Sequence, residues 1–396
     1  MVHTAPARDP LIDALRGFAL FGILAVNIQT FSTGLTGASL GVLDAASSTA
    51  DRFAVATTAF FLQYKFYPIF CFCFGYGFAV QTRRWRAQGR DAAQRFKRRT
   101  DFLLRLGVAH GVLLWFGDIL TSYALAGKVL ASHIGKGPKK LLPVLRFWLL
   151  LTLGVAIPVT ILLTADLGGG SALIPDDPST SRQVQAQTIA TYTQGSTLDA
   201  LGQRVGDYLT VTVGFLLTGA EIIFIMLVGA WCAHAGVLRQ AGRHAAFWRK
   251  VLKVSLAVGL PLNAWFALAH WQHAHEPWVA RSLWQAFPDG LVSVLAAALV
   301  AGLALQRGGR AVQGFVAVFA PAGRYALTHY VGQSLAMFLM LGGSGLGWGA
   351  TLRQAELLSI ALAVFLVQLL ASHVMVQRGI EGPLEAWWRR HTHDSH

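Results

Sequence analysis

The chain has 396 residues and a formal net charge of +14, with 54% hydrophobic and only 13% charged residues. A soluble protein carries about 25% charged residues. Here the apolar residues fall in runs of roughly 20, the length of helix that crosses a bilayer. This composition excludes an ordinary soluble enzyme and predicts an all-α, polytopic membrane helical bundle, with residues 1–396 forming a single integral membrane domain.

Ten apolar runs predict about ten transmembrane helices. The first is too long for the apolar part of a signal peptide, so we expect it to remain as a helix. The second is long and contains Pro68, which predicts a bend at Tyr67-Pro68. The third and fourth are short and separated only by Gly117 and Asp118. The predicted ranges are 11–31, 53–80, 101–116, 118–134, 141–165, 208–236, 246–270, 278–305, 315–341 and 355–377.

The basic residues lie in alternate loops. One set of loops and tails holds 23 Lys and Arg, eight of them in the loop Arg83–Arg99, whereas the opposite loops hold five. The positive-inside rule therefore places both termini and the basic loops in the cytoplasm. Membrane lipids account for this charge, and no nucleic-acid partner is needed. The longest outward-facing loop, 166–207, is rich in Gly, Ser, Asp and Pro in its first part, which is typical of a flexible segment.

The first run keeps polar side chains on one face. Asp13 and Arg16 are three residues apart and can pair on one helical turn. Arg16 and Asn27 are eleven residues apart, close to three turns, so Asn27 lies on the same face roughly 17 Å deeper. This spacing predicts either the inner wall of a site, or an arginine that reaches the headgroups together with an asparagine that bonds a neighbouring helix.

Two further candidate functional residues, His110 and Asp118, lie near the end of the third run. On one continuous helix, His110 and Asp118 would lie about 12 Å apart and would not touch. A turn at Gly117 would bring Asp118 back toward His110. A histidine within a membrane bundle is either a hydrogen-bonding residue between helices or a proton acceptor in catalysis.

The ninth run is the most polar. Tyr325, His329 and Gln333 recur every four residues and form a continuous stripe, which Arg324 and Thr328 flank. Such a stripe would be very unfavourable against lipid, so it either lines a cavity or binds other helices. We favour the cavity, because a purely structural contact needs fewer polar groups.

Two carboxylates fall within apolar runs. Glu221 and Asp289 are each neutral, paired with a cation such as Arg324, or able to carry a proton. No metal site is expected from the two histidine groups, 270–276 and 391–396, because the first fits a membrane interface and the second is a tail. The three cysteines lie in apolar runs without metal-ligand spacing, which indicates packing residues.

Five segments together resemble the YeiB-like family of bacterial membrane proteins, a domain of unknown function. This resemblance implies a multi-pass protein of the bacterial inner membrane. His329 departs from the family pattern, which has asparagine there. The segments are DALRGFALFGILAVNI (13–28), FYPIFCFCFGYGF (66–78), RLGVAHGVLLWFGDILTSYAL (105–125), GRYALTHYVGQSL (323–335) and GPLEAWWR (382–389).

The first helix is also similar to that of heparan-α-glucosaminide N-acetyltransferase-like membrane acyltransferases. That resemblance implies transfer of an acetyl group from cytoplasmic acetyl-CoA to an acceptor on the other side, and it carries over to Asp13, Arg16 and Asn27. These acyltransferases have a histidine shortly after the first helix, and residues 32–52 contain none. Either His110 takes its place or the chemistry differs.

Three functional hypotheses follow. The first is an acyltransferase that uses acyl-CoA as co-substrate, without a permanently bound cofactor, and a small-molecule, glycan or lipid acceptor. His110, Asn27 and Asp118 would perform its chemistry, and Asp13, Arg16, Arg324, Tyr325, His329, Gln333 and Glu221 would bind the substrates. The second is a transporter for a small polar or lipid-linked solute with Glu221 or Asp289 as proton carrier. The third is a lipid-binding membrane component. The oligomeric state is left open, a homodimer included.

Overall fold

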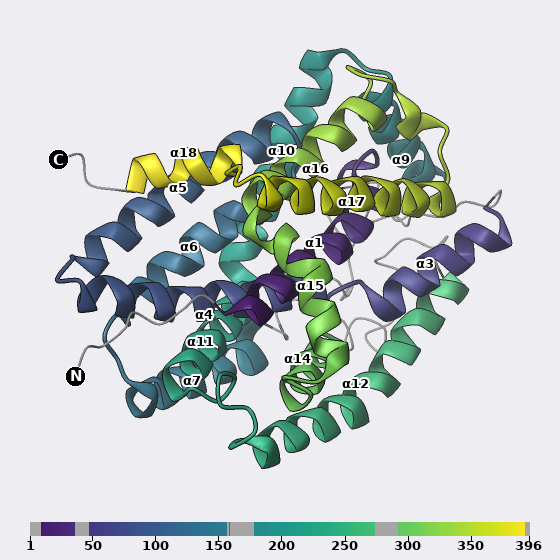
Figure 1. Ribbon diagram of the computed structural model, residues 1–396. Coiled ribbons are helices and arrows are strands. Elements are labelled where there is room, and N and C mark those ends of the chain that lie inside the picture. The colour runs from purple at the N-terminus through teal and green to yellow at the C-terminus, as the bar shows by residue number, and fades with distance from the viewer. Residues whose placement is uncertain (1–8, 36–46, 157, 159–177, 274–291, 393–396) are drawn as a thin grey trace.

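The computed structural model describes residues 9–35, 47–156, 158, 178–273 and 292–392, and every regular element in these ranges is helical (Figure 1). A π-helical turn, Thr152–Ala156, and a 3₁₀ turn, Trp348–Ala350, accompany the α-helices. The α-helices are α1 (Pro10–Thr30), α3 (Thr49–Phe61), α4 (Phe66–Ala87), α5 (Ala92–Leu113), α6 (Leu120–Ala131), α7 (Pro138–Leu151), α9 (Pro178–Thr193), α10 (Thr197–Thr218), α11 (Ala220–Ala235), α12 (Ala245–His273), α14 (Val294–Leu305), α15 (Arg310–Arg324), α16 (Ala326–Leu341), α17 (Gln354–Gln377) and α18 (Pro383–Thr392).

Helix α1 runs through the interior of the bundle (Figure 1). It packs against α4, α15, α16 and α17, and its Leu15, Leu20 and Ile28 are completely buried. Helices α12 and α17 instead lie at the periphery and expose apolar side chains, such as Leu370 at 67%. A broad exposed apolar surface is unfavourable in water and favourable in lipid.

Among the described residues, three helices are long and apolar enough to cross a membrane, namely α1, α12 and α17. The pair α10–α11 meets the same test as one span bent by 63°. The protein is therefore a helical membrane protein.

Two predicted spans are each divided into two helices at positions that were not predicted. The run 53–80 divides into α3 and α4 at 62–65, where Tyr64 adopts a left-handed backbone conformation with φ of 61°. The predicted bend at Tyr67-Pro68 is wrong, because Pro68 is the third residue of α4, where a missing N–H is tolerated. The run 208–236 divides at Gly219, so Glu221 lies in the first turn of α11 and not in the middle of a span.

Other segments differ from prediction in length. The described part of the loop expected to be flexible, 178–207, contains α9 and the first half of α10. Helix α5 starts at Ala92, nine residues before the predicted span, and so carries Arg99 on a helix. The run 315–341 divides into α15 and α16 at Tyr325. Residues 159–165 and 278–291 of two further predicted spans, Asp289 among them, lie outside the described residues.

Glycines allow the closest helix crossings. A Cβ atom on Gly323 of α15 would lie 1.8 Å from the Asp13 carbonyl oxygen of α1, and one on Gly17 would lie 2.1 Å from the Phe319 carbonyl oxygen. The α4–α11 crossing is similar, because a Cβ on Gly75 would lie 1.8 Å from the carbonyl oxygen of Met226. Small residues let helix backbones approach in membranes. Here they hold the first turns of α1 against α15.

We expect Gly323→Ala to destabilise the protein by at least about 1–3 kcal/mol, because the added methyl group meets backbone that cannot move independently of α1. Gly314→Ala is the matched control on the same helix, since a Cβ there meets nothing within 4 Å. Thermal unfolding of the detergent-solubilised proteins measures both. Equal unfolding temperatures for the two variants would contradict the packing argument.

Candidate functional site

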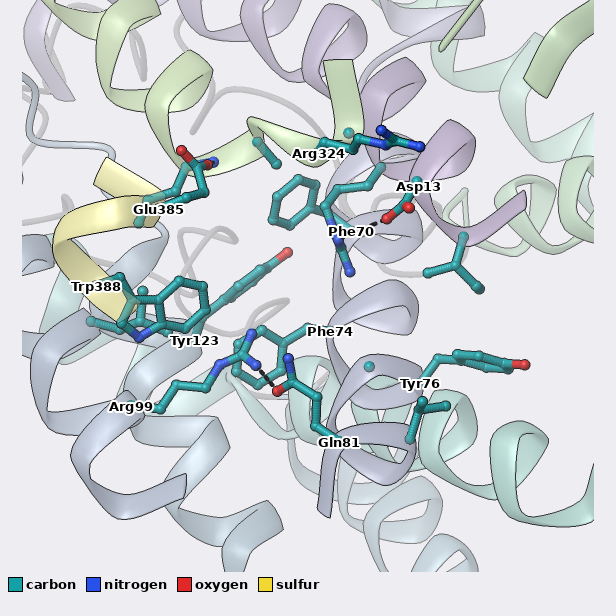
Figure 2. Close-up of a pocket in the computed structure, with 18 of the residues that line it drawn as sticks. Asp13, Phe70, Phe74, Tyr76, Gln81, Arg99, Tyr123, Arg324, Glu385 and Trp388 are labelled. Carbon is teal, nitrogen blue, oxygen red and sulfur yellow. Dashed lines mark hydrogen bonds and ion pairs between the residues drawn. The ribbon is translucent and has the colours of Figure 1, made fainter. Parts of the chain in front are cut away.

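A cavity of about 810 Å³ opens beside the N-terminal half of α1. Its walls come from α1, α4, α5, α6, α15, α16 and α18, so both ends of the described chain contribute to it (Figure 2). Arg16 and Ile23 of α1 both line it, and their separation of seven residues gives it a depth of about 10 Å. The inner end is apolar and aromatic, with Ile23, Tyr123 and Tyr330.

The outer part of the cavity is strongly basic. Asp13 and Arg16 form the predicted pair at 3.4 Å, and Arg389 is paired with Glu381 at 2.6 Å. The other four arginines contact no carboxylate in the described part of the chain. The six arginines that line the cavity are Arg16, Arg84, Arg90, Arg99, Arg324 and Arg389.

The acidic residues of the cavity are largely occupied elsewhere. Asp9 is bound by Arg307 at 2.8 Å, and Glu385 accepts the backbone N–H groups of Leu327 and Thr328 at the start of α16. These carboxylates therefore compensate little of the arginine charge. A pocket with unpaired guanidinium groups favours a ligand that carries several negative charges.

Arg99 lines this pocket with its guanidinium stacked on the ring of Trp388, a pair that we call the Arg99–Trp388 platform. Its guanidinium lies 4.1 Å from the centroid of the Trp388 ring and donates a hydrogen bond to Gln81 (Figure 2). The Nε of Arg99 and the Nε1 of Trp388 are buried donors that find no hydrogen-bond partner among the described residues. Burial, together with the nearby charge of Arg16, lowers the pKa of Arg99 to about 9, so the side chain remains a cation at neutral pH. Unsatisfied buried donors are costly, and an anionic ligand would satisfy them.

His110 and Asp118 are brought together as the turn at Gly117 predicted. The chain leaves α5 at Leu113 and returns at α6, and Nδ1 of His110 lies 2.9 Å from Oδ1 of Asp118 with both side chains completely buried. The two atoms lie within hydrogen-bonding distance, but the ring N–H is not aligned with the carboxylate oxygen. Gly107 makes room for it, because a Cβ there would lie 2.8 Å from Oδ2 of Asp118.

Asp118 is itself fixed by the start of α6. Its Oδ1 accepts the N–H of Leu120 at 3.1 Å and its Oδ2 accepts that of Thr121 at 2.7 Å. The carboxylate can therefore hold the imidazole of His110 in one orientation. A carboxylate oxygen only accepts, so Nδ1 carries the proton and Nε2 of a neutral His110 is left as an acceptor.

Ser334 of α16 occupies that acceptor. Its Oγ lies 2.8 Å from Nε2 of His110, completing a buried Ser334–His110–Asp118 arrangement from α16, α5 and the turn before α6. Sequence analysis missed Ser334 because it is 224 residues from His110 in the chain. One signal was present, since Ser334 follows Tyr330 by one turn on the face of α16 next to the predicted stripe.

Ser334, His110 and Asp118 do not themselves line the cavity, but they lie directly behind residues at its inner end. The ring of Tyr330, which lines the cavity, lies 5.0 Å from the His110 ring, and Ile119 and Leu120 beside Asp118 also line it. Asn27, predicted as an oxyanion donor, is half-buried and does not line this cavity.

The polar stripe of α16 is placed differently from the preferred prediction. His329 bonds Ser372 at 2.6 Å, Gln333 donates to Gln368 at 2.8 Å, and Tyr325 donates to the carbonyl of Ile380. None of the three stripe residues lines the cavity just described. They attach α16 to α17 and to the segment that follows it, which satisfies buried polar groups. Of the stripe and the two residues that flank it, only Arg324, at the end of α15, lines the cavity.

Glu221 is also outside this cavity. Its carboxylate accepts the hydroxyl groups of Tyr67 at 2.8 Å and Ser293 at 2.9 Å, so the suggested pairing with Arg324 is wrong. These bonds connect α11 to α4 and to the residue before α14.

Comparison with known proteins places the chain in context. Residues 232–394 match the family described as Protein of unknown function (DUF418). The chain is 28% identical over 402 residues to the uncharacterised protein YxaH of Bacillus subtilis, covering 98% of this chain and 94% of that protein. It is 27% identical over 401 residues to the uncharacterised protein YeiB of Escherichia coli, covering 97% and 96%. The predicted resemblance to the YeiB-like family is confirmed.

A third relative is similar to this chain over a shorter stretch. An uncharacterised 39.9 kDa protein of Bacillus acidopullulyticus is 38% identical over 120 residues, which covers 30% of this chain and 32% of that protein. The relatives' names state no activity. The function is therefore inferred from the geometry and charge of the cavity and its neighbouring residues.

Proposed function

We propose that the protein is a multi-pass enzyme of the bacterial inner membrane that transfers an acyl group from cytoplasmic acyl-CoA to an acceptor within the membrane or at its outer face. The observation that carries this proposal is the arginine-lined cavity whose inner end adjoins His110 and Asp118. Acyl-CoA has the matching shape, with several phosphate charges at one end and a thioester at the end of a long arm.

The spacing along α5 fits this ligand. Arg99 and His110 are eleven residues apart, close to three turns, so they share a face and lie about 16 Å apart along the axis. An extended pantetheine arm can bridge that length. Phosphates bound by Arg99 and its neighbours would thus leave the thioester near His110.

The orientation in the membrane supports the same direction of transfer. The basic loop Arg83–Arg99 contributes three arginines to the cavity mouth, and α1 and α18 bring both ends of the chain to it. With about ten spans and both termini in the cytoplasm, the mouth faces the compartment that holds CoA.

The chemistry assigned to His110 is general base catalysis. Its Nε2 accepts the proton of the attacking hydroxyl or amine and then returns it to the departing CoA sulfur, while Asp118 holds the ring. Tyr330 is placed to donate to the developing oxyanion, because it lines the cavity and contacts His110. It takes the role first assigned to Asn27.

Titration calorimetry with the purified full chain in detergent tests the proposal. We expect acetyl-CoA and free CoA to bind more tightly than pantetheine, which lacks the nucleotide phosphates, and binding to weaken as salt is raised. Absence of binding by acetyl-CoA and by a long-chain acyl-CoA would reject the proposal.

A further inference from the structure

We propose that Ser334 is a nucleophile that carries the acyl group as a covalent ester, so that transfer proceeds in two half-reactions. The choice of acyl-CoA as donor rests on the function proposed above. The assignment of Ser334 itself rests on its geometry with His110 and Asp118.

The three groups have the relation of an activated nucleophile to its base. Oγ of Ser334 lies 2.8 Å from Nε2 of His110, and Nδ1 of the same ring lies 2.9 Å from the Asp118 carboxylate. A nucleophilic hydroxyl within 2.6–3.2 Å of a base that a third group orients is the general signature of covalent catalysis. The other contact of the Ser334 hydroxyl, to the Tyr330 carbonyl, is longer at 3.5 Å.

A second serine–histidine pair on α16 provides an internal comparison. His329 bonds Ser372 at 2.6 Å, which attaches α16 to α17. No carboxylate contacts His329 in the described part of the chain, whereas Asp118 lies 2.9 Å from His110. A bond between helices therefore needs only serine and histidine. The Asp118 carboxylate beside His110 is not required for such a bond.

The cavity gives the acyl donor a route toward Ser334. Tyr330, one turn before Ser334 on α16, lines the inner end of the cavity. Its hydroxyl oxygen accepts the N–H of Ile119 at 3.2 Å, and its own proton has no acceptor among the described residues. That O–H can donate to the oxygen of the tetrahedral intermediate, and accepting one hydrogen bond strengthens its donation of another.

The two half-reactions balance without a further reagent. In the first, Oγ attacks the thioester carbonyl, its proton passes to Nε2 of His110, the C–S bond breaks, and the CoA sulfur takes that proton and leaves as the thiol. In the second, an acceptor hydroxyl or amine attacks the Ser334 ester and gives its proton to Nε2. The C–Oγ bond then breaks, and Ser334 recovers its proton from His110.

The experiment uses the full chain in detergent with two donors, acetyl-CoA and p-nitrophenyl acetate, which needs no CoA site. We expect one acetyl group on Ser334 by intact-protein and peptide mass spectrometry, with a burst of p-nitrophenolate equal to the enzyme present. Ser334→Ala is expected to lose both, with turnover reduced at least about 1,000-fold. Ser372→Ala, the matched control on the other serine–histidine pair, is expected to behave as the wild type.

Each contrary outcome separates the two proposals. Turnover of acetyl-CoA by Ser334→Ala at the wild-type rate would overturn the covalent step and leave direct transfer from acyl-CoA. Acetylation of Ser334 by p-nitrophenyl acetate in a protein that binds no acyl-CoA would support the nucleophile and reject the donor. Ser334→Cys guards against loss of folding, because it fills the same space and is expected to form a thioester that hydroxylamine cleaves. An unmodified, folded Ser334→Cys would count against the proposal.

Discussion

His110→Ala is expected to lower turnover of acetyl-CoA by about 100- to 10,000-fold, the contribution of a positioned general base. In the proposed mechanism the imidazole is the proton acceptor next to the inner end of the cavity, whereas the arginines proposed to bind phosphates lie at its mouth. Acetyl-CoA binding should therefore persist in the variant, so that kcat falls while the dissociation constant changes little. Release of CoA thiol in the presence of bacterial membrane lipids measures turnover, and calorimetry measures binding.

The control for this variant is His329→Ala. His329 is a buried histidine on α16 that bonds Ser372 and contacts no carboxylate in the described part of the chain, so its loss is expected to leave kcat close to the wild-type value. Asp118→Asn adds a second measurement, because it keeps the size of the side chain and one of the two oxygens that accept N–H groups at the start of α6. It should lower kcat with little change in KM, as expected for a residue that positions the base. Equal losses in His110→Ala and His329→Ala would indicate a structural effect.

Much of the site could be predicted where the signal is local. The i, i+3 spacing of Asp13 and Arg16 predicts their pair, and the structure contains it at 3.4 Å. The Gly117-Asp118 sequence interrupts an apolar run, and the resulting turn brings Asp118 to His110. Both follow from helical geometry over a few residues.

The sequence-based predictions fail where contacts between segments that are distant in the chain determine the structure. The stripe of Tyr325, His329 and Gln333 is continuous in sequence, but whether it meets a cavity or a helix depends on where α17 packs. The division at Tyr325 also depends on tertiary contacts, since Glu385 of α18 accepts backbone N–H groups in the first turn of α16 and so lets a helix begin there. Ser334 and Trp388 join the site from the C-terminal part of the chain, and no local pattern pairs them with His110 or Arg99.

Arg99→Gln is expected to weaken acetyl-CoA binding by about 10- to 100-fold, since a hydrogen bond to a charged group contributes about 1.5–3 kcal/mol and each 1.4 kcal/mol is tenfold in affinity. Arg99 is the arginine held against Trp388 with a buried Nε donor left unsatisfied, so it is preorganised for a phosphate. Calorimetry at two salt concentrations gives the affinity and its salt dependence.

The matched control is Arg105→Gln, on the same helix and with the same change of charge, but exposed and outside the cavity lining. Its loss should leave the affinity near that of the wild type. An equal weakening by both substitutions would show that acyl-CoA responds only to the general positive field of the cytoplasmic face. Weakening by Arg99→Gln alone, smaller for pantetheine than for acetyl-CoA, would place the ligand's phosphates at the Arg99–Trp388 platform. The thioester would then extend along α5 toward His110.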